Sequence, residues 1–186
     1  MSVRNKERWA SATDEELARL GQAGDDAAFG ALVERHHGVV YRVALSIVSD
    51  PDLAQDVTQE AFLKALRALG GFRGEAAFRT WLLTITANAA RSALRKNGRK
   101  RETDLDGMVP IASGDPDPAE QAVAAQEAAQ ARALLSRLPE KQRLSVQLRI
   151  DEGLSFREVA EVIGSSEGAA RVNYFHGIRR LREWMS

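Results

Sequence analysis

The N-terminal half of the chain places apolar residues three and four positions apart, as on one face of an α-helix. The longest apolar stripe covers residues 29–47 and consists of Phe29, Leu32, Val33, His36, Val40, Val43, Ala44 and Ile47. Asp50 and Pro51 then interrupt it, because aspartate caps helices and proline is favoured in a first helical turn. The pattern predicts this long helix and a second one from about Asp52 to Leu69, and no strand.

The predicted second helix has a polar side and an apolar side. We expect Leu53, Val57, Phe62 and Leu66 to lie opposite a polar set made of Asp52, Gln55, Asp56, Gln59 and Glu60. A polar, acidic helix face is often only a solvated surface. It is also suited to docking a basic partner, because charge complementarity guides the encounter and the register of a complex.

Residues 72–96 interleave aromatic and cationic side chains. Trp81, Leu82 and Ile85 are compatible with ordinary core packing. A second interpretation is a site for single-stranded nucleic acid, because aromatic rings stack on bases, at about 1–3 kcal/mol per base, while arginines hold the backbone. The residues that would form such a site are Arg79, Trp81, Asn88, Arg91 and Arg95.

Residues 154–182 have the pattern of a helix-turn-helix. Ser155 and Glu158 have the spacing of a capping box, and Gly164 supplies the backbone freedom of a tight turn. A second helix from about Ser166 would bury Ala170, Tyr174, Ile178 and Leu181. It would expose a stripe suited to phosphates and to base edges in a major groove, made of Arg171, Val172, Phe175, His176 and Arg179. An amphipathic hairpin with a solvated basic face is the alternative.

The distribution of charge separates these two helical regions. The 186-residue chain has 26 basic and 26 acidic residues, and a net charge of zero argues against a nucleic-acid binder. Yet a basic block over 91–101 precedes a segment, 102–120, that has acidic residues and no lysine or arginine. This segment also contains glycine and proline without apolar periodicity, as in a flexible linker. We therefore predict an all-α fold with two small helical domains, 12–100 and 122–186, joined by a flexible acidic linker over 101–121.

Several function classes are disfavoured by the same sequence. The chain has no cysteine, no apolar run of membrane-spanning length, and a first segment, 1–9, that is too polar for a signal peptide. We expect a cytoplasmic protein without membrane insertion. His36 and His37 point to different sides of a helix, and no nucleophile motif or phosphate-binding loop occurs. We therefore expect no enzymatic activity, metal or cofactor.

Segments 52–66 and 72–82, followed by 138–143 and 152–161, together resemble the extracytoplasmic-function (ECF) group of bacterial RNA polymerase sigma factors. The resemblance covers nearly the whole chain. It implies a dissociable subunit that binds core RNA polymerase, directs it to selected promoters and helps to open the duplex. It further implies control by an anti-sigma factor.

The resemblance also implies roles for the residue sets above. The acidic helix face, Asp52 to Glu60, would dock on the clamp helices of the polymerase beta-prime subunit, in a complex that includes the beta subunit. Asn88 would recognise a base flipped from the non-template strand at the minus-ten element, supported by Arg79, Trp81, Arg91 and Arg95. Arg171, Val172, Phe175 and His176 would enter the groove at the minus-thirty-five element. Here residues 172–177 depart from the commoner family pattern, which has more cations after the turn.

Two other interpretations remain open. A helix-turn-helix activator or repressor that acts without a sigma role could have the same C-terminal region, and would normally be a dimer on a palindromic site. A protein that binds RNA or single strands could use residues 72–96 alone, but the C-terminal region would then have no role.

Overall fold

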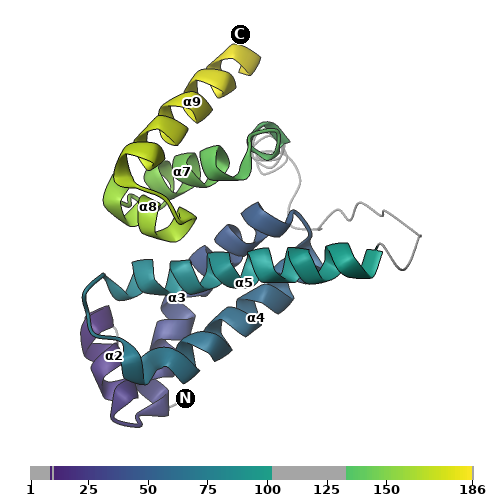
Figure 1. Ribbon diagram of the computed structural model, residues 1–186. Coiled ribbons are helices and arrows are strands. Elements are labelled where there is room, and N and C mark those ends of the chain that lie inside the picture. The colour runs from purple at the N-terminus through teal and green to yellow at the C-terminus, as the bar shows by residue number, and fades with distance from the viewer. Residues whose placement is uncertain (1–8, 10, 102–132, 186) are drawn as a thin grey trace, which may run out of the picture. The chain divides into compact units, whose positions relative to one another are not determined.

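Helices account for all regular structure in the part of the chain that the computed structural model describes, residues 9, 11–101 and 133–185. These residues fall into two compact units. Figure 1 labels the helices that they contain. The predicted all-α class is confirmed. The predicted linker, 101–121, lies outside the described residues except for Arg101, and the exact domain boundaries stay predictions.

The N-terminal part contains α2 (Asp14–Gln22), α3 (Asp26–Val48), α4 (Pro51–Ala68), the short 3-10 helix η1 (Leu69–Gly71) and α5 (Phe78–Arg101). Thr13 and Glu16 form a capping box at the start of α2. Between α3 and α4, Ser49 adopts a left-handed conformation with a φ of 57°. The Asp50 carboxylate then accepts a hydrogen bond of 3.0 Å from the backbone N–H of Leu53. The predicted break between the two helices is therefore confirmed.

The core of this part centres on α3, in which Leu32, Val40 and Ala44 are fully buried. From α4, mostly small side chains enter the core, namely Ala54, Val57, Thr58, Ala61, Phe62 and Ala65. The expectation that Leu66 faces the core is wrong, since 45% of this residue is exposed. The reason is helical geometry: Leu66 follows Gln59 by seven positions, about two turns, and so shares its polar face.

A polar cluster, of which only His36 is buried, connects the start of α2 to α3. The Nε2 atom of His36 lies 2.7 Å from one carboxylate oxygen of Asp14, and the Arg35 guanidinium lies 2.6 Å from the other. Arg35 also donates to the backbone oxygens of Trp9 and Ala12, at 3.0 Å each. Burial raises the pKa of Asp14, but hydrogen bonds from His36 and Arg35 and their charges together hold that pKa below its ordinary value.

The C-terminal part contains α7 (Glu140–Ile150), α8 (Phe156–Ile163) and α9 (Glu167–Met185). The capping box of α8 is present: the Glu158 carboxylate accepts from the Ser155 backbone N–H at 2.8 Å, and the Glu158 N–H donates to the Ser155 hydroxyl at 3.3 Å. Gly164 has a φ of +64°, the conformation that the turn requires. In α9, Ala170 is fully buried, whereas Tyr174, Ile178 and Leu181 are only half-buried.

Two residues hold α7 in place. Gly177 of α9 lies so close to α7 that a Cβ atom there would come within 2.7 Å of Val146 Cγ2 and 3.3 Å of the Gln142 backbone oxygen. Arg143 is buried and donates to the backbone oxygens of Ser136 and Leu138 at 3.2 and 3.0 Å. Burial lowers the pKa of its guanidinium, which the charge of Glu140 partly offsets.

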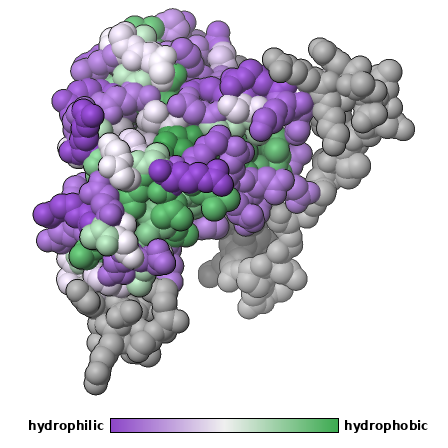
Figure 2. Space-filling view, turned by 60° about the horizontal axis from the view of Figure 1, so that its bottom comes forward, coloured by the Kyte–Doolittle hydropathy of each residue, from purple (hydrophilic) through white to green (hydrophobic). Residues whose placement is uncertain are grey.

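Large apolar side chains are also exposed at a few places on a mainly hydrophilic surface, and Figure 2 shows a hydrophobic area framed by hydrophilic residues. Among the described residues they are Leu63, Leu66, Leu94, Ile150, Val172, Phe175 and Met185. Several of these lie on the helix faces that the sequence marks as functional.

Candidate functional site

Most of the predicted single-strand residues share one face of α5. Asn88 follows Trp81 by seven positions and Arg95 follows Asn88 by seven, so the three side chains lie along one stripe at intervals of about two helical turns. Asn88 and Arg95 are exposed, whereas Arg91 is half-buried on the adjoining side. Arg79 precedes Trp81 by two positions, a rotation of about 200°. The structure therefore does not bring Arg79 onto this stripe.

An aromatic cluster fixes the position of Trp81 at the start of this stripe. The ring centre of Trp81 lies 5.1 Å from that of Phe72 and 5.5 Å from that of Phe78. Phe72 and Phe78 meet edge to face at 5.5 Å, and Phe78 is buried. Such pairs add to the stability gained from burial alone. Trp81 is thus half-buried in this cluster, and part of its surface stays accessible.

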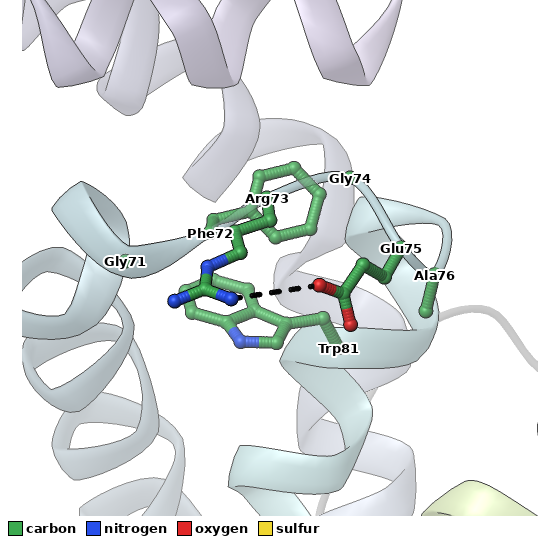
Figure 3. A pocket seen from close by; sticks show the side chains of 7 residues that line it. All are labelled: Gly71, Phe72, Arg73, Gly74, Glu75, Ala76 and Trp81. Carbon is green, nitrogen blue, oxygen red and sulfur yellow. Dashed lines mark ion pairs between the residues drawn. The ribbon is translucent and has the colours of Figure 1, made fainter.

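A pocket lies beside the exposed part of Trp81, where the loop after η1 leads into α5 (Figure 3). Its volume is about 350 Å³, and residues 71–76 line it together with Trp81. The Arg73 guanidinium faces the Glu75 carboxylate at 3.9 Å, both side chains being largely exposed. Gly74 has a φ of +73°, which lets the loop turn at this point. The sequence interpretation missed this pocket, although glycines at 70, 71 and 74 signalled an unusual loop.

The predicted acidic set lies on one side of α4. Asp52, Gln55, Asp56 and Gln59 are exposed, and Glu60 is half-buried and forms an ion pair of 2.8 Å with Lys64. Gln55 lies at the edge of this face. The same face continues with Leu63 and Leu66, which are 53% and 45% exposed. Sequence interpretation missed this extension, since it assigned Leu66 to the core side.

The predicted recognition stripe is exposed along α9. Arg171, Val172, Phe175, His176 and Arg179 are all exposed, with 55% of Val172 and 58% of Phe175 accessible. The Arg171 guanidinium donates to the Glu167 carboxylate at 3.1 Å. Phe175 contacts Tyr174 edge to face, with ring centres 5.3 Å apart. The stripe therefore offers cations and apolar groups together, as base edges and thymine methyl groups require.

Other kinds of site find no support in the described part of the chain. No group of histidine, cysteine, aspartate or glutamate side chains there could hold a metal ion. None of the helices described is both long enough and apolar enough to cross a membrane.

Comparison with known families and proteins identifies the family of this chain. Residues 32–100 match Sigma-70 region 2, and residues 128–181 match Sigma-70 region 4. The RNA polymerase sigma-H factor of Pseudomonas aeruginosa is 37% identical, with 87% of this chain and 88% of the relative covered. The ECF RNA polymerase sigma-E factor of Escherichia coli is 35% identical, with 88% of this chain and 89% of the relative covered.

Solved structures show the same fold. A structure of CnrH in complex with the cytosolic domain of CnrY has a TM-score of 0.69 at 26% identity, covering 92% of this chain and 96% of that one. The sigma factor RpoE of Bartonella quintana, solved with the anti-sigma factor NepR, has a TM-score of 0.68 at 22% identity, covering 84% and 96%. Together with the two region matches, the relatives show that this chain belongs to the ECF group of RNA polymerase sigma factors, which are transcription initiation factors.

Proposed function

We propose that three helix faces divide the work of this initiation factor. The face of α4 binds core RNA polymerase, the stripe of α5 with its adjoining pocket receives the separated minus-ten strand, and the stripe of α9 reads the minus-thirty-five duplex. The observation that carries this proposal is the single stripe on α5. It combines a half-buried tryptophan, a pocket beside it and an exposed amide about two turns away.

For the minus-ten strand, the proposed path follows the α5 stripe. Trp81 offers a stacking surface, and Arg91 and Arg95 place positive charge beside the phosphates farther along the helix. Asn88 can both donate to and accept from the edge of an extruded base. The pocket volume of about 350 Å³ falls within the range of small-ligand sites, about 300–1,000 Å³, so an unstacked base is a suitable occupant. Arg79, on another side of α5, has at most an indirect role.

For polymerase binding, the proposed surface joins a polar half to an apolar half. Asp52, Asp56 and Gln59 supply charge and hydrogen-bonding groups, and exposed Leu63 and Leu66 continue the same face. A basic and partly apolar helical partner, as expected of the beta-prime clamp helices, suits both halves. The polar half would guide the encounter, and the apolar half would add affinity by burial.

For the minus-thirty-five element, α9 is proposed as the helix in the major groove. Arg171 and Arg179 can contact guanine edges or phosphates, while Val172 and Phe175 suit thymine methyl groups. His176 adds a further polar contact. The protein would thus bind duplex DNA through α9 and a separated strand through α5.

Regulation and location follow from the same proposal. We propose that an anti-sigma factor controls this chain, supported by the fold it shares with a sigma factor solved in such a complex. A protein that covered the α4 face would block polymerase binding directly. The factor would act in the cytoplasm, where core polymerase works, and perform no bond chemistry itself.

The test is transcription from a promoter library by purified protein and bacterial core polymerase, with base preference scored at each promoter position. Asn88→Ala is expected to alter preference within the minus-ten element only. Asn97→Ala is a matched control, because this exposed asparagine lies on the same helix but about 160° around it from Trp81. Equal profiles for both variants would remove Asn88 from the site. DNA binding to a palindrome without any dependence on polymerase would instead favour a helix-turn-helix regulator.

A further inference from the structure

Gln22 forms a link between α2 and the loop that lines the pocket. It is the last residue of α2, and its side-chain amide donates to the backbone oxygen of Leu69 at 2.9 Å and to that of Phe72 at 2.8 Å. Both amide hydrogens are therefore used. The two acceptors stand at either end of a short stretch that contains Gly70 and Gly71. A backbone hydrogen bond of 3.0 Å from the Phe72 N–H to the Leu69 oxygen closes the stretch, and the Gln22 side chain ties both of its ends to α2.

The stretch needs such a link because of its composition. Glycine has more backbone freedom to lose than any other residue, and a Cβ atom at Gly70 or Gly71 would meet nothing within 4 Å. Neighbouring side chains therefore do little to hold the backbone there. The hydrogen bonds from Gln22 add a constraint to the packing of the buried Leu69 side chain at one end of the stretch.

The position of this backbone decides the shape of the pocket. Gly71 and Phe72 line the pocket directly, and the Phe72 ring contacts the rings of Trp81 and Phe78. A shift of the Phe72 backbone would move its ring and open or narrow the space beside Trp81. The side chain of Gln22 does not itself line the pocket.

We propose that Gln22 is a positioning residue for promoter opening: it holds the pocket loop in the shape that accepts an unstacked base of the separated strand. This inference rests on the proposed function of the pocket. Gln22 is itself an exposed residue, so its replacement leaves the apolar core intact. Its effect is on strand capture rather than on folding.

The hydrogen-bonding chemistry of Gln22 predicts which of its variants impairs strand capture more. Gln22→Ala removes both hydrogen bonds and leaves the backbone bond of 3.0 Å from the Phe72 N–H to the Leu69 oxygen to close the stretch. Gln22→Glu keeps the size of the side chain but turns a donor of two hydrogen bonds into an acceptor, which faces two backbone oxygens and repels them. Glutamate is therefore expected to be more harmful than alanine, the reverse of what side-chain size alone predicts.

The experiment uses holoenzyme assembled from the full chain and core polymerase, with forked promoter DNA that carries 2-aminopurine at single positions of the non-template minus-ten strand. A change in 2-aminopurine fluorescence at one of these positions identifies the base that becomes unstacked. Gln22→Ala is expected to reduce this signal about fivefold to tenfold, the equivalent of about one hydrogen bond, and Gln22→Glu to reduce it further. Core affinity and duplex binding at the minus-thirty-five element should remain unchanged. Glu15→Gln, an exposed change on the same helix, is the control and should match the wild type.

A pocket-filling variant tests the role of the pocket separately from the role of Gln22. Ala76→Trp places a bulky ring in the pocket lining and is expected to abolish the fluorescence change. If Ala76→Trp has no effect, the proposed role of the pocket fails. If Ala76→Trp abolishes the signal while Gln22→Ala and Gln22→Glu both retain it, the pocket keeps its role and the inference about Gln22 is overturned. An equal loss of core affinity and strand capture in the Gln22 variants would also overturn it, since that result indicates general misfolding.

Discussion

The guanidinium carbon of Arg171 lies 4.8 Å from the centre of the Phe156 ring, which joins the start of α8 to the proposed recognition stripe of α9. Arg149 approaches the same ring at 4.9 Å and also donates to the Leu154 backbone oxygen. Phe156 therefore contacts two cations through its π system, and its ring packs edge to face with that of Tyr174, with ring centres 5.5 Å apart. This arrangement restricts the Arg171 side chain, and so would limit its reach in the proposed contact with the major groove.

Replacing Phe156 by leucine keeps an apolar side chain but removes the π face. We expect affinity for a minus-thirty-five duplex to fall about twofold to fivefold, as a partly exposed cation–π contact contributes about 0.5–1 kcal/mol. Fluorescence anisotropy with labelled duplex and the full chain measures this. Phe156→Tyr retains the ring and should bind like the wild type, whereas equal losses in both variants would argue against the cation–π contact.

Charge reversal on α4 tests the polymerase surface. Asp56→Lys combined with Glu60→Lys should lower affinity for core polymerase about tenfold or more, because like charges then face a basic partner. The control pair, Glu15→Lys with Glu34→Lys, makes the same change of net charge at exposed positions on α2 and α3. Competition binding against a labelled sigma factor compares the two. Similar losses in both pairs would indicate a long-range charge effect and not a docking face.

The Asp14 cluster predicts a pH dependence of stability. Because the pKa of Asp14 is lower in the folded chain than in the unfolded one, the carboxylate stabilises the fold at pH values above its unfolded pKa, near 4. That contribution is lost as the pH falls through the folded pKa. Asp14→Asn should therefore cost about 1 kcal/mol at pH 7, a value reduced for partial solvent exposure, and progressively less below pH 4.

Urea unfolding of the wild type and Asp14→Asn between pH 3 and pH 8 measures this difference. Glu15→Gln serves as the control, since it removes a neighbouring exposed carboxylate. A constant difference between wild type and Asp14→Asn over the whole pH range would contradict the ionic role of Asp14.

The close packing of α9 on α7 predicts a steric defect. Gly177→Ala should destabilise the C-terminal part by about 1–3 kcal/mol, because the added carbon meets Val146 Cγ2 at 2.7 Å. Adding Val146→Ala should recover part of the loss. Gly168→Ala on the same helix meets nothing within 4 Å and should not destabilise the protein, as alanine is the better helix former. Thermal unfolding followed by circular dichroism distinguishes these cases.

Local signals predicted the parts of the fold that depend on neighbours in sequence. Ser155 and Glu158 are three positions apart, and the capping box they form was predictable from that spacing. The break at Asp50 and Pro51 was predictable for the same reason. Each of these features uses contacts within a single helical turn, which a pattern of residue types records directly.

The remaining features join residues that are distant in sequence. Gln22 contacts Leu69 and Phe72 across 47 and 50 positions, and Asp14 meets His36 across 22. The periodicity of residue types does not predict such pairs, because they depend on how the helices pack against one another. The separation of Arg79 from Trp81 differs in kind, because it follows from helical rotation over two positions and was therefore predictable from their spacing.

The hydrogen bonds from Gln22 also affect the choice of the residue at which two sigma factors are joined to make a chimaera. The match to region 2 begins at residue 32, inside α3, whereas Gln22 lies at the end of α2. A domain exchange cut at that boundary would transfer α5 and the pocket loop before it without the Gln22 side chain, which donates hydrogen bonds to that loop. A chimaera joined at residue 32 keeps the α2 helix of the recipient protein. Its promoter specificity would then depend on whether that helix ends in a side chain that can donate two hydrogen bonds.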